Sequence, residues 1–179
     1  MPPVSGSSAR EKARSVRWLV LDVDGVLTDG RIILDGGEGE WKAFDVRDGQ
    51  RIVLAAREGI RTVFLTGRSS RVVARRAAEL GVHRVFQGAR DKGEVIDLFF
   101  REEGARPEET AYLGDDIVDL PALRRVGLAA AVGDAVLEVQ AAADWIAAAA
   151  GGHGAVREFV EFILKAQGRW DAAIAGFSR

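Results

Sequence analysis

The residues that most restrict the fold of this chain are those at positions 20–30, VLDVDGVLTDG. An apolar run at 18–21 leads directly into Asp22, and Asp24 follows two positions later, before Gly25. An apolar run of this length that ends in a turn signal predicts a buried β-strand. Because side chains alternate across a strand, both carboxylates then lie on one face at its carboxyl end. Neighbouring carboxylates repel each other unless a cation or a shared proton intervenes, so the segment predicts a cation-binding or catalytic site rather than a simple polar turn.

The composition predicts one globular domain. Its 179 residues are 47% apolar and 29% charged, which is ordinary for a chain with a single hydrophobic core. A net charge of −2 argues against a nucleic-acid partner bound through a basic surface. The absence of cysteine excludes disulfides and zinc–thiolate sites. No segment has the character of a signal peptide or a membrane span, so the protein is expected to be cytoplasmic, with no membrane partner.

Strand-like and helix-like segments alternate along the rest of the chain. RIIL at 31–34 and EWKAF at 40–44 flank the turn-rich DGGEG, which predicts a β-hairpin. The polar stretch DVRDG at 45–49 is expected to be a loop. The later strands are expected at 60–65, 83–86, 110–113, 128–132 and 145–146, and the helices at 50–58, 69–80, 91–103, 116–125, 135–143 and 155–167.

This alternation predicts the fold class. Repeated strand–helix units form a parallel sheet with helices on both faces and right-handed crossovers. We therefore expect an α/β fold: a Rossmann-like, doubly wound parallel sheet with a β-hairpin insertion after the first strand and no separate cap domain. In such folds ligands bind beyond the carboxyl ends of the strands, near the switch in strand order.

Polar side chains follow three of the expected strands at that edge. They are Asp22 and Asp24 after the first, Thr66 after the second, and Asp115 and Asp116 after the third, with Lys92 at the start of a helix and Asp119 one turn after Asp116. Carboxylate oxygens suit Mg²⁺, and a carboxylate can attack phosphorus to form an aspartyl phosphate. A hydroxyl, a lysine and helix-start N–H groups can hold the other phosphoryl oxygens. Singly, each residue is explained by a cap, a solvated helix face or a turn; together they favour phosphoryl transfer.

The same residues carry a family resemblance. DVDGVLTDG at 22–30, LTGR at 65–68, Lys92 and GDDIVD at 114–119 resemble the four motifs of the haloacid dehalogenase superfamily of phosphohydrolases. Three longer segments are similar to the 3-deoxy-D-manno-octulosonate 8-phosphate phosphatase family: FDVRDG at 44–49, YLGDDIVDLP at 112–121 and GGHGAVREFVEFILKAQG at 151–168. This resemblance covers nearly everything from Arg17 to Gly168. It implies Mg²⁺-dependent release of phosphate from a sugar acid, a step of lipopolysaccharide biosynthesis.

The resemblance also implies roles for the carboxylates. Asp22 would be the nucleophile and a Mg²⁺ ligand. Asp24 would be the general acid and base, with its backbone carbonyl on the metal. Asp115 would be the remaining protein ligand.

The other motif residues would support these three. Thr66 and Lys92 would hold the transferring phosphoryl group. Asp116 and Asp119 are expected to lie behind the ligands or to cap a helix, and Asp119 to orient Lys92.

Substrate recognition would use the polar segments around the site. The implied contacts are Asp24, Asp45, Val46, Arg47, Asp48, Gly49, Arg68, Arg76 and Lys92. A keto-acid phosphate carries a carboxylate as well as a phosphate, so guanidinium groups suit it. Arg76 has the alternative of facing water, because Arg71, Arg75 and Arg76 share one helix.

The chain departs from the family pattern at Asp45, Arg51, Val53 and His153. These departures leave the phosphoryl-transfer residues intact and bear on which sugar acid is bound. Two alternatives to the implied function are open. One is a phosphatase of a nine-carbon keto-acid phosphate. The other is a non-catalytic oligomerisation module related to cytidylyltransferase C-terminal domains.

The resemblance finally implies an assembly and a domain plan. A homotetramer is expected, with the C-terminal tail near a neighbouring active site, and the apolar hairpin residues favour an oligomer. We expect a disordered segment at 1–14, a haloacid dehalogenase-like hydrolase domain at 15–168, and a flexible C-terminus at 169–179. Within the domain lie the hairpin at 31–44 and a tail helix at 154–168.

Overall fold

The predicted parallel sheet is present. The computed structural model describes residues 7–37 and 39–176, and in them six parallel strands pair in the order β5-β4-β1-β6-β7-β8. The strands are β1 (Trp18–Leu21), β4 (Arg61–Leu65), β5 (Arg84–Phe86), β6 (Thr110–Gly114), β7 (Leu128–Ala131) and β8 (Trp145–Ile146). The chain runs outward from β1 through β4 to β5, then returns to β6 on the other side of β1. The switch in strand order therefore lies between β1 and β6.

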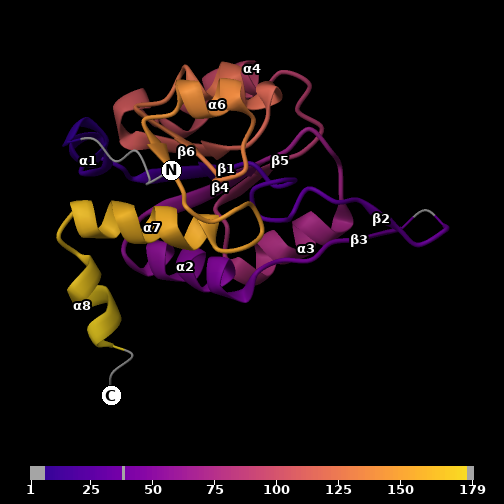
Figure 1. Ribbon diagram of the computed structural model, residues 1–179, viewed down its shortest axis with the longest axis horizontal. Helices are drawn as coiled ribbons and strands as arrows, with labels where there is room; N and C mark the ends of the chain where they lie inside the picture. Colours follow the sequence, from indigo (N-terminus) through magenta and orange to yellow (C-terminus); the bar gives the residue numbers. More distant parts are fainter. Residues whose placement is uncertain (1–6, 38, 177–179) are drawn as a thin grey trace.

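Helices cover both faces of this sheet. Figure 1 shows α2, α3 and α7 on one side and α4 and α6 on the other, as a doubly wound fold requires. The helices are α1 (Ser7–Ala13), α2 (Val46–Arg57), α3 (Arg71–Leu80), α4 (Lys92–Glu103), α5 (Leu120–Leu123), α6 (Leu137–Ala142), α7 (Ala155–Ala166) and α8 (Trp170–Ala175), with 3₁₀ turns η1 (Pro107–Glu109) and η2 (Ile117–Asp119). None of the helices in these described ranges is long and apolar enough to cross a membrane.

Strand β1 lies at the centre of the core. All four of its residues are buried, because the strand has a parallel neighbour on each side and helices over both faces. Leu21 lies beside Phe64 of β4 and Leu113 of β6. This register brings the residues that follow the three strands to a common edge.

The insertion after β1 is a two-stranded ribbon that projects from the body of the molecule (Figure 1). Its strands are β2 (Ile33–Leu34) and β3 (Glu40–Trp41), which pair antiparallel and are shorter than predicted. Several of its apolar side chains face outward: Ile32, Ile33, Leu34 and Trp41 are 49%, 54%, 71% and 68% exposed. Phe44 instead packs against the core of its own domain.

Helix α2 begins earlier than predicted, and the expectation of a polar loop at 45–49 is wrong. Asp45 is the N-cap, and its side chain accepts hydrogen bonds from the backbone N–H groups of Arg47 and Asp48. A glycine at position 49 suggests a loop, but here it allows close packing. A Cβ added to Gly49 would lie 2.2 Å from Nη2 of Arg76, so only glycine leaves room for that side chain.

Both ends of the described chain also differ from prediction. Disorder was expected over residues 1–14, but residues 7–13 form α1, whose Ala9 and Ala13 are buried in the core. Residues 170–175 of the expected flexible C-terminus form α8. Residues 1–6 and 177–179 lie outside the described ranges. Apart from these two alanines α1 is largely polar, so its packing against the core was not predictable from its sequence.

The tail helix α7 belongs to the core of its own domain. Val156, Phe159, Val160, Ile163 and Leu164 are all buried, as the amphipathic pattern predicted, and the helix packs along α2. Trp145 of β8 stacks on Phe159 with ring centroids 4.9 Å apart. Removing α7 would therefore expose the core of its own domain.

Candidate active site

The strand register brings the predicted carboxylates and Thr66 to one edge of the sheet. Asp22 follows β1 directly, and its N–H donates to the carbonyl of Leu113 in β6 at 3.1 Å. Thr66 follows β4, with its N–H bonded to the carbonyl of Phe86, and Asp115 follows β6. This edge lies at the switch in strand order, where a doubly wound sheet binds ligands.

Lys92 connects two of the carboxylates. Helix α4 begins at this residue because Asp91 caps it, accepting the N–H groups of Gly93 and Glu94. The Lys92 ammonium lies 2.8 Å from Oδ1 of Asp22 and 2.6 Å from Oδ1 of Asp119. Its side chain is 4% exposed. Burial alone would lower the pKa of Lys92, but these two carboxylates together raise it, so the ammonium stays charged.

Asp119 is fully buried and all its acceptor positions are used. Its Oδ1 accepts from Lys92 and, at 2.6 Å, from the hydroxyl of Tyr112. Its Oδ2 accepts the N–H groups of Asp115 at 2.9 Å and Asp116 at 3.2 Å. The expected contact between Asp119 and Lys92 is therefore present. Asp119 also ties the loop after β6 to the lysine.

Asp22 and Asp115 face each other with too little positive charge to neutralise them. Burial, and then the neighbouring carboxylates, raise the pKa of both groups. Oδ1 of Asp115 is buried and has no hydrogen-bond partner among the residues that the structure describes. One oxygen each from Asp22, Asp115 and Asp119 lies within 4.8 Å of the others. Since Asp119 is saturated by donors, the unpartnered oxygen of Asp115 and the carboxylate of Asp22 are the groups suited to a hard cation such as Mg²⁺.

A glycine makes this approach of carboxylates sterically feasible. Gly25 has φ of +96°, and a Cβ added there would lie 2.0 Å from Oδ2 of Asp115. The chain therefore turns sharply after Asp24 and leaves space for the Asp115 carboxylate. The residues 151–154 pack on the other side of this turn, where the N–H of Gly152 donates to the carbonyl of Val26 at 2.9 Å.

Asp24 is held by two side chains from different elements. The hydroxyl of Thr66 donates to its Oδ2 at 3.3 Å. The ammonium of Lys42, from the hairpin, donates to its Oδ1. Sequence reasoning missed Lys42, because a lysine on a short ribbon has the pattern of a solvent-facing residue. The signal that was present is the alternation of Glu40, Trp41 and Lys42, which puts the two charges on one face of the strand.

These groups line a cleft of about 320 Å³. Asp22, Asp24, Thr66, Lys92, Asp115 and Asp116 all contribute to its wall, so the structure brings together the motif residues that the sequence predicted. Arg68 and Arg90 add positive charge to it. Arg90 was not predicted, because nothing in its local sequence distinguishes it from a solvated arginine.

The remaining residues expected to contact substrate lie outside this cleft. Asp48 is buried beneath α7, where its carboxylate accepts the N–H groups of Gly154 at 3.2 Å and Arg157 at 2.7 Å. Arg47 is largely exposed and pairs with Asp45 at 2.7 Å, and hydrogen bonds from Arg47 hold the pKa of Asp45 at about 2.

Val46 and Arg76 also lie outside the cleft wall. Val46 is 73% exposed. Arg76 lies over the ring of Phe44 with its guanidinium carbon 5.7 Å from the centroid, and pairs with Glu79 at 3.4 Å. Together with the hydrogen bonds of Asp48, these contacts hold α2 against α3 and α7.

The departures from the family pattern are likewise absent from the cleft wall. Arg51 pairs with Glu161 at 3.0 Å and lies over the ring of Trp170, so it joins α2, α7 and α8. Val53 packs against the core, and His153 is exposed on the turn before α7. None of them alters the carboxylate cluster.

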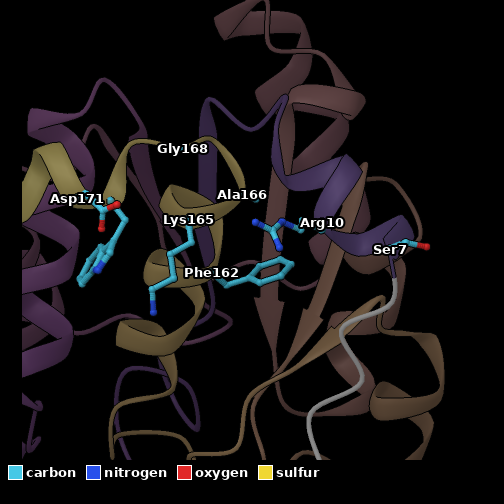
Figure 2. A pocket seen from close by; sticks show the side chains of 8 residues that line it. Ser7, Arg10, Phe162, Lys165, Ala166, Gly168 and Asp171 are labelled. Carbon is cyan, nitrogen blue, oxygen red and sulfur yellow. The ribbon is translucent and has the colours of Figure 1, made fainter.

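A second and larger hollow, of about 770 Å³, lies between α1, α7 and α8. Figure 2 shows Arg10 of α1 next to Phe162 of α7, with Lys165 of α7 nearby. Arg10 and Lys165 are exposed, and the described residues that line the hollow include no cluster of carboxylates or nucleophiles. The cleft at the strand ends, and not this hollow, is therefore the candidate active site.

The fold and this cluster at the switch point define the class of the protein. A family model described as haloacid dehalogenase-like hydrolase matches residues 34–127, slightly over half of the chain. The class is that of the haloacid dehalogenase-like hydrolases, and within it the chain is a phosphatase.

Sequence relatives identify the family within this class to which the chain belongs. The chain is 42% identical over 171 residues to 3-deoxy-D-manno-octulosonate 8-phosphate phosphatase of Escherichia coli (strain B / BL21-DE3), covering 96% of this chain and 90% of the relative. The chain therefore belongs to the 3-deoxy-D-manno-octulosonate 8-phosphate phosphatase family.

Solved structures of this family superpose closely on the chain. The phosphatase of Moraxella catarrhalis, determined with a magnesium ion, a phosphate ion and a KDO molecule, has a TM-score of 0.92 and 41% identity, over 94% of this chain and 97% of that one. The cobalt-bound deoxy-D-mannose-octulosonate 8-phosphate phosphatase of Haemophilus influenzae has a TM-score of 0.86 and 40% identity, over 90% of this chain and 94% of that one.

Proposed function

We propose that this chain is a Mg²⁺-dependent phosphomonoesterase that hydrolyses 3-deoxy-D-manno-octulosonate 8-phosphate to the free sugar acid and phosphate. The observation that carries the proposal is the cluster of Asp22, Lys92 and Asp115 at the switch in strand order. A buried lysine that bridges two carboxylates carries a desolvation penalty. A non-catalytic oligomerisation module would bear that penalty without using the charges for catalysis.

The residues fit Mg²⁺. The proposed ligands are the carboxylates of Asp22 and Asp115 and the backbone carbonyl of Asp24. Bound there, the ion would neutralise charge on the carboxylates and on the phosphoryl oxygens.

The chemistry would proceed in two displacements. A carboxylate oxygen of Asp22 attacks phosphorus, the bond from phosphorus to the sugar oxygen breaks, and that oxygen leaves with the bonding electrons and takes a proton from Asp24. Asp24 then removes a proton from water, the water oxygen attacks the aspartyl phosphate, and the bond from phosphorus to Asp22 breaks. The products are the sugar acid and phosphate, and both carboxylates return to their starting states.

Thr66 and Lys92 would stabilise the phosphoryl group during both steps. The ammonium of Lys92 lies 2.8 Å from Asp22, the proposed nucleophile, and Thr66 lines the same cleft with its hydroxyl 3.3 Å from Asp24. Held by Asp119, the ammonium keeps its position as charge develops, which is the condition for electrostatic stabilisation of a transition state.

For the sugar acid, the proposal relies on positive charge at the rim of the cleft. Arg68 lines it, and a guanidinium group can bind a carboxylate through two hydrogen bonds. Residues 45–49 and Arg76 would contribute by fixing α2 and α3 beneath the rim, as their contacts indicate.

A panel of phosphate esters tests the substrate. We expect the octulosonate 8-phosphate to be hydrolysed with a kcat/KM at least about 10-fold above that of a nine-carbon keto-acid phosphate or a neutral hexose 6-phosphate, because a misplaced carboxylate forfeits about 1.4 kcal/mol or more of transition-state binding. Phosphate release with Mg²⁺ measures it. A preference for the nine-carbon ester would identify the alternative substrate, and equal rates would contradict recognition of the sugar acid.

We further propose a homotetramer that forms through the hairpin, with residues beyond α7 near a neighbouring active site. An isolated two-stranded ribbon is marginally stable, and this one exposes Ile33, Leu34 and Trp41. Helix α8 projects away from the body in Figure 1, so it is the part of the tail with the freedom to reach another subunit.

Charging the hairpin should break this assembly. We expect Trp41→Glu to shift the sedimentation of the protein from tetramer toward monomer at micromolar concentration, because the carboxylate would have to be desolvated in an apolar interface. Leu137→Glu is the matched control, since Leu137 is 78% exposed on α6, away from the hairpin. A wild-type monomer, or a Trp41→Glu protein that stays tetrameric, would contradict assembly through this surface.

A further inference from the structure

Lys42 is a buried lysine on an otherwise exposed hairpin. Its side chain is 1% exposed, whereas the preceding Trp41 is 68% exposed. The alternation of a strand turns Glu40 and Lys42 inward and Trp41 outward. A buried ammonium is costly unless it is paired, so the partners of Lys42 define what it does.

Those partners belong to the catalytic cleft. The Lys42 ammonium donates to Oδ1 of Asp24 and lies 3.7 Å from Oε2 of Glu40. The same oxygen of Glu40 accepts from Nη2 of Arg68 at 3.2 Å. A continuous series of charged contacts thus runs from Asp24 to the arginine at the rim, through the inner face of the hairpin.

The two oxygens of Asp24 are held from opposite sides. Thr66, at the end of β4, donates to Oδ2, and Lys42 donates to Oδ1. Asp24 lies three residues after the end of β1 and just before the turn at Gly25, so it lies outside the strand and these two donors fix its carboxylate. With one donor on each oxygen, rotation breaks at least one charge-assisted hydrogen bond.

We propose that Lys42 is a positioning residue that holds the Asp24 carboxylate in the orientation for proton transfer to the leaving sugar oxygen. The hairpin is then a part of the catalytic site as well as an exposed ribbon. This inference rests on the proposed role of Asp24 as the general acid, and it predicts an effect that depends on the leaving group.

The experiment compares two esters in Lys42→Met and wild type. An alkyl phosphate such as the octulosonate 8-phosphate expels a basic alkoxide that needs the proton, whereas p-nitrophenyl phosphate expels a stable phenolate that does not. General acid catalysis contributes roughly 10²–10⁴-fold, and a misoriented acid loses part of that. We expect kcat/KM to fall about 30-fold or more for the alkyl ester and about 3-fold or less for p-nitrophenyl phosphate.

Further variants separate positioning from folding. Lys12→Met removes another lysine–aspartate pair, 2.5 Å from Asp144 on the surface, and should leave both rates unchanged. Lys42→Gln, whose amide can still donate to Asp24, should recover part of the alkyl-ester activity, and it carries the comparison if Lys42→Met does not fold.

Equal losses with both esters in the Lys42 variants, or no loss with either, would overturn the positioning role. A wild-type protein that hydrolyses p-nitrophenyl phosphate but no alkyl phosphate would overturn the proposed function itself, and the role of Lys42 with it. Activity of the wild type on alkyl phosphates other than the octulosonate ester would overturn the substrate alone, and the Lys42 comparison then uses the accepted ester.

Discussion

Asp22→Asn is expected to abolish turnover of every phosphate ester, with a loss on the order of 10⁴-fold or more in kcat, because an amide cannot serve as the attacking carboxylate. The fold should persist. Asparagine has the size of aspartate, and burial already raises the pKa of Asp22 by penalising its charged form. Phosphate release measures the loss, and thermal unfolding confirms that the variant is folded.

The matched control changes the same functional group at a nearby position. Asp91→Asn keeps a side-chain oxygen that can cap α4, so its activity should remain within about 3-fold of wild type. If Asp22→Asn retained more than a few per cent of wild-type turnover with a verified sequence, the nucleophile would have to be another group in the cleft. Trapping of a phosphorylated aspartate in the wild type, absent from the variant, locates the intermediate directly.

The carboxylate cluster was predictable from the sequence because its geometry follows from strand ends. Asp22, Thr66 and Asp115 each follow an apolar run, and parallel strands in register must bring such residues together. No knowledge of side-chain packing is needed for that inference. Lys92 was predictable for a similar reason, since Asp91 marks the start of its helix.

Residues placed by tertiary packing were not predictable in the same way. Lys42 acquires its partner only when the hairpin brings it to Asp24, and the alternation of Glu40, Trp41 and Lys42 predicts a shared face but not that contact. The first turn of α2 has the composition of a loop, yet Asp45 caps it and Gly49 receives the side chain of Arg76. Helix α1 depends on two alanines that contact the core. In each case a long-range contact overrides the local preference.

Asp119 links catalysis to stability, and its removal should have a large effect on the free energy of unfolding. Asp119→Ala leaves the buried Lys92 with one carboxylate and removes the acceptor from the hydroxyl of Tyr112 and from two backbone N–H groups. Breaking a buried pair of this kind costs about 3–5 kcal/mol. Asp119→Asn should also be destabilising. An asparagine NH₂ group cannot accept a hydrogen bond, so one pair of donors, either Lys92 and Tyr112 or the two backbone N–H groups, loses its acceptor. Asp97→Asn, which removes an exposed pair with Arg125, should change stability by less than about 1 kcal/mol.

The same variant decides whether Asp119 positions Lys92 or binds the metal. Its carboxylate lies close enough to Asp22 and Asp115 to join a metal site, but all its acceptor positions are already used by protein donors. A positioning role predicts that denaturant unfolding without metal already shows the full loss, and that Mg²⁺ still stabilises the variant by about as much as the wild type, since a ligand stabilises only the state it binds. A ligand role predicts the reverse: a small loss without metal, and no gain from Mg²⁺. The ammonium of Lys92 lies 2.6 Å from Asp119 and 2.8 Å from Asp22, the proposed nucleophile, so the first outcome should also lower kcat far more than it raises KM.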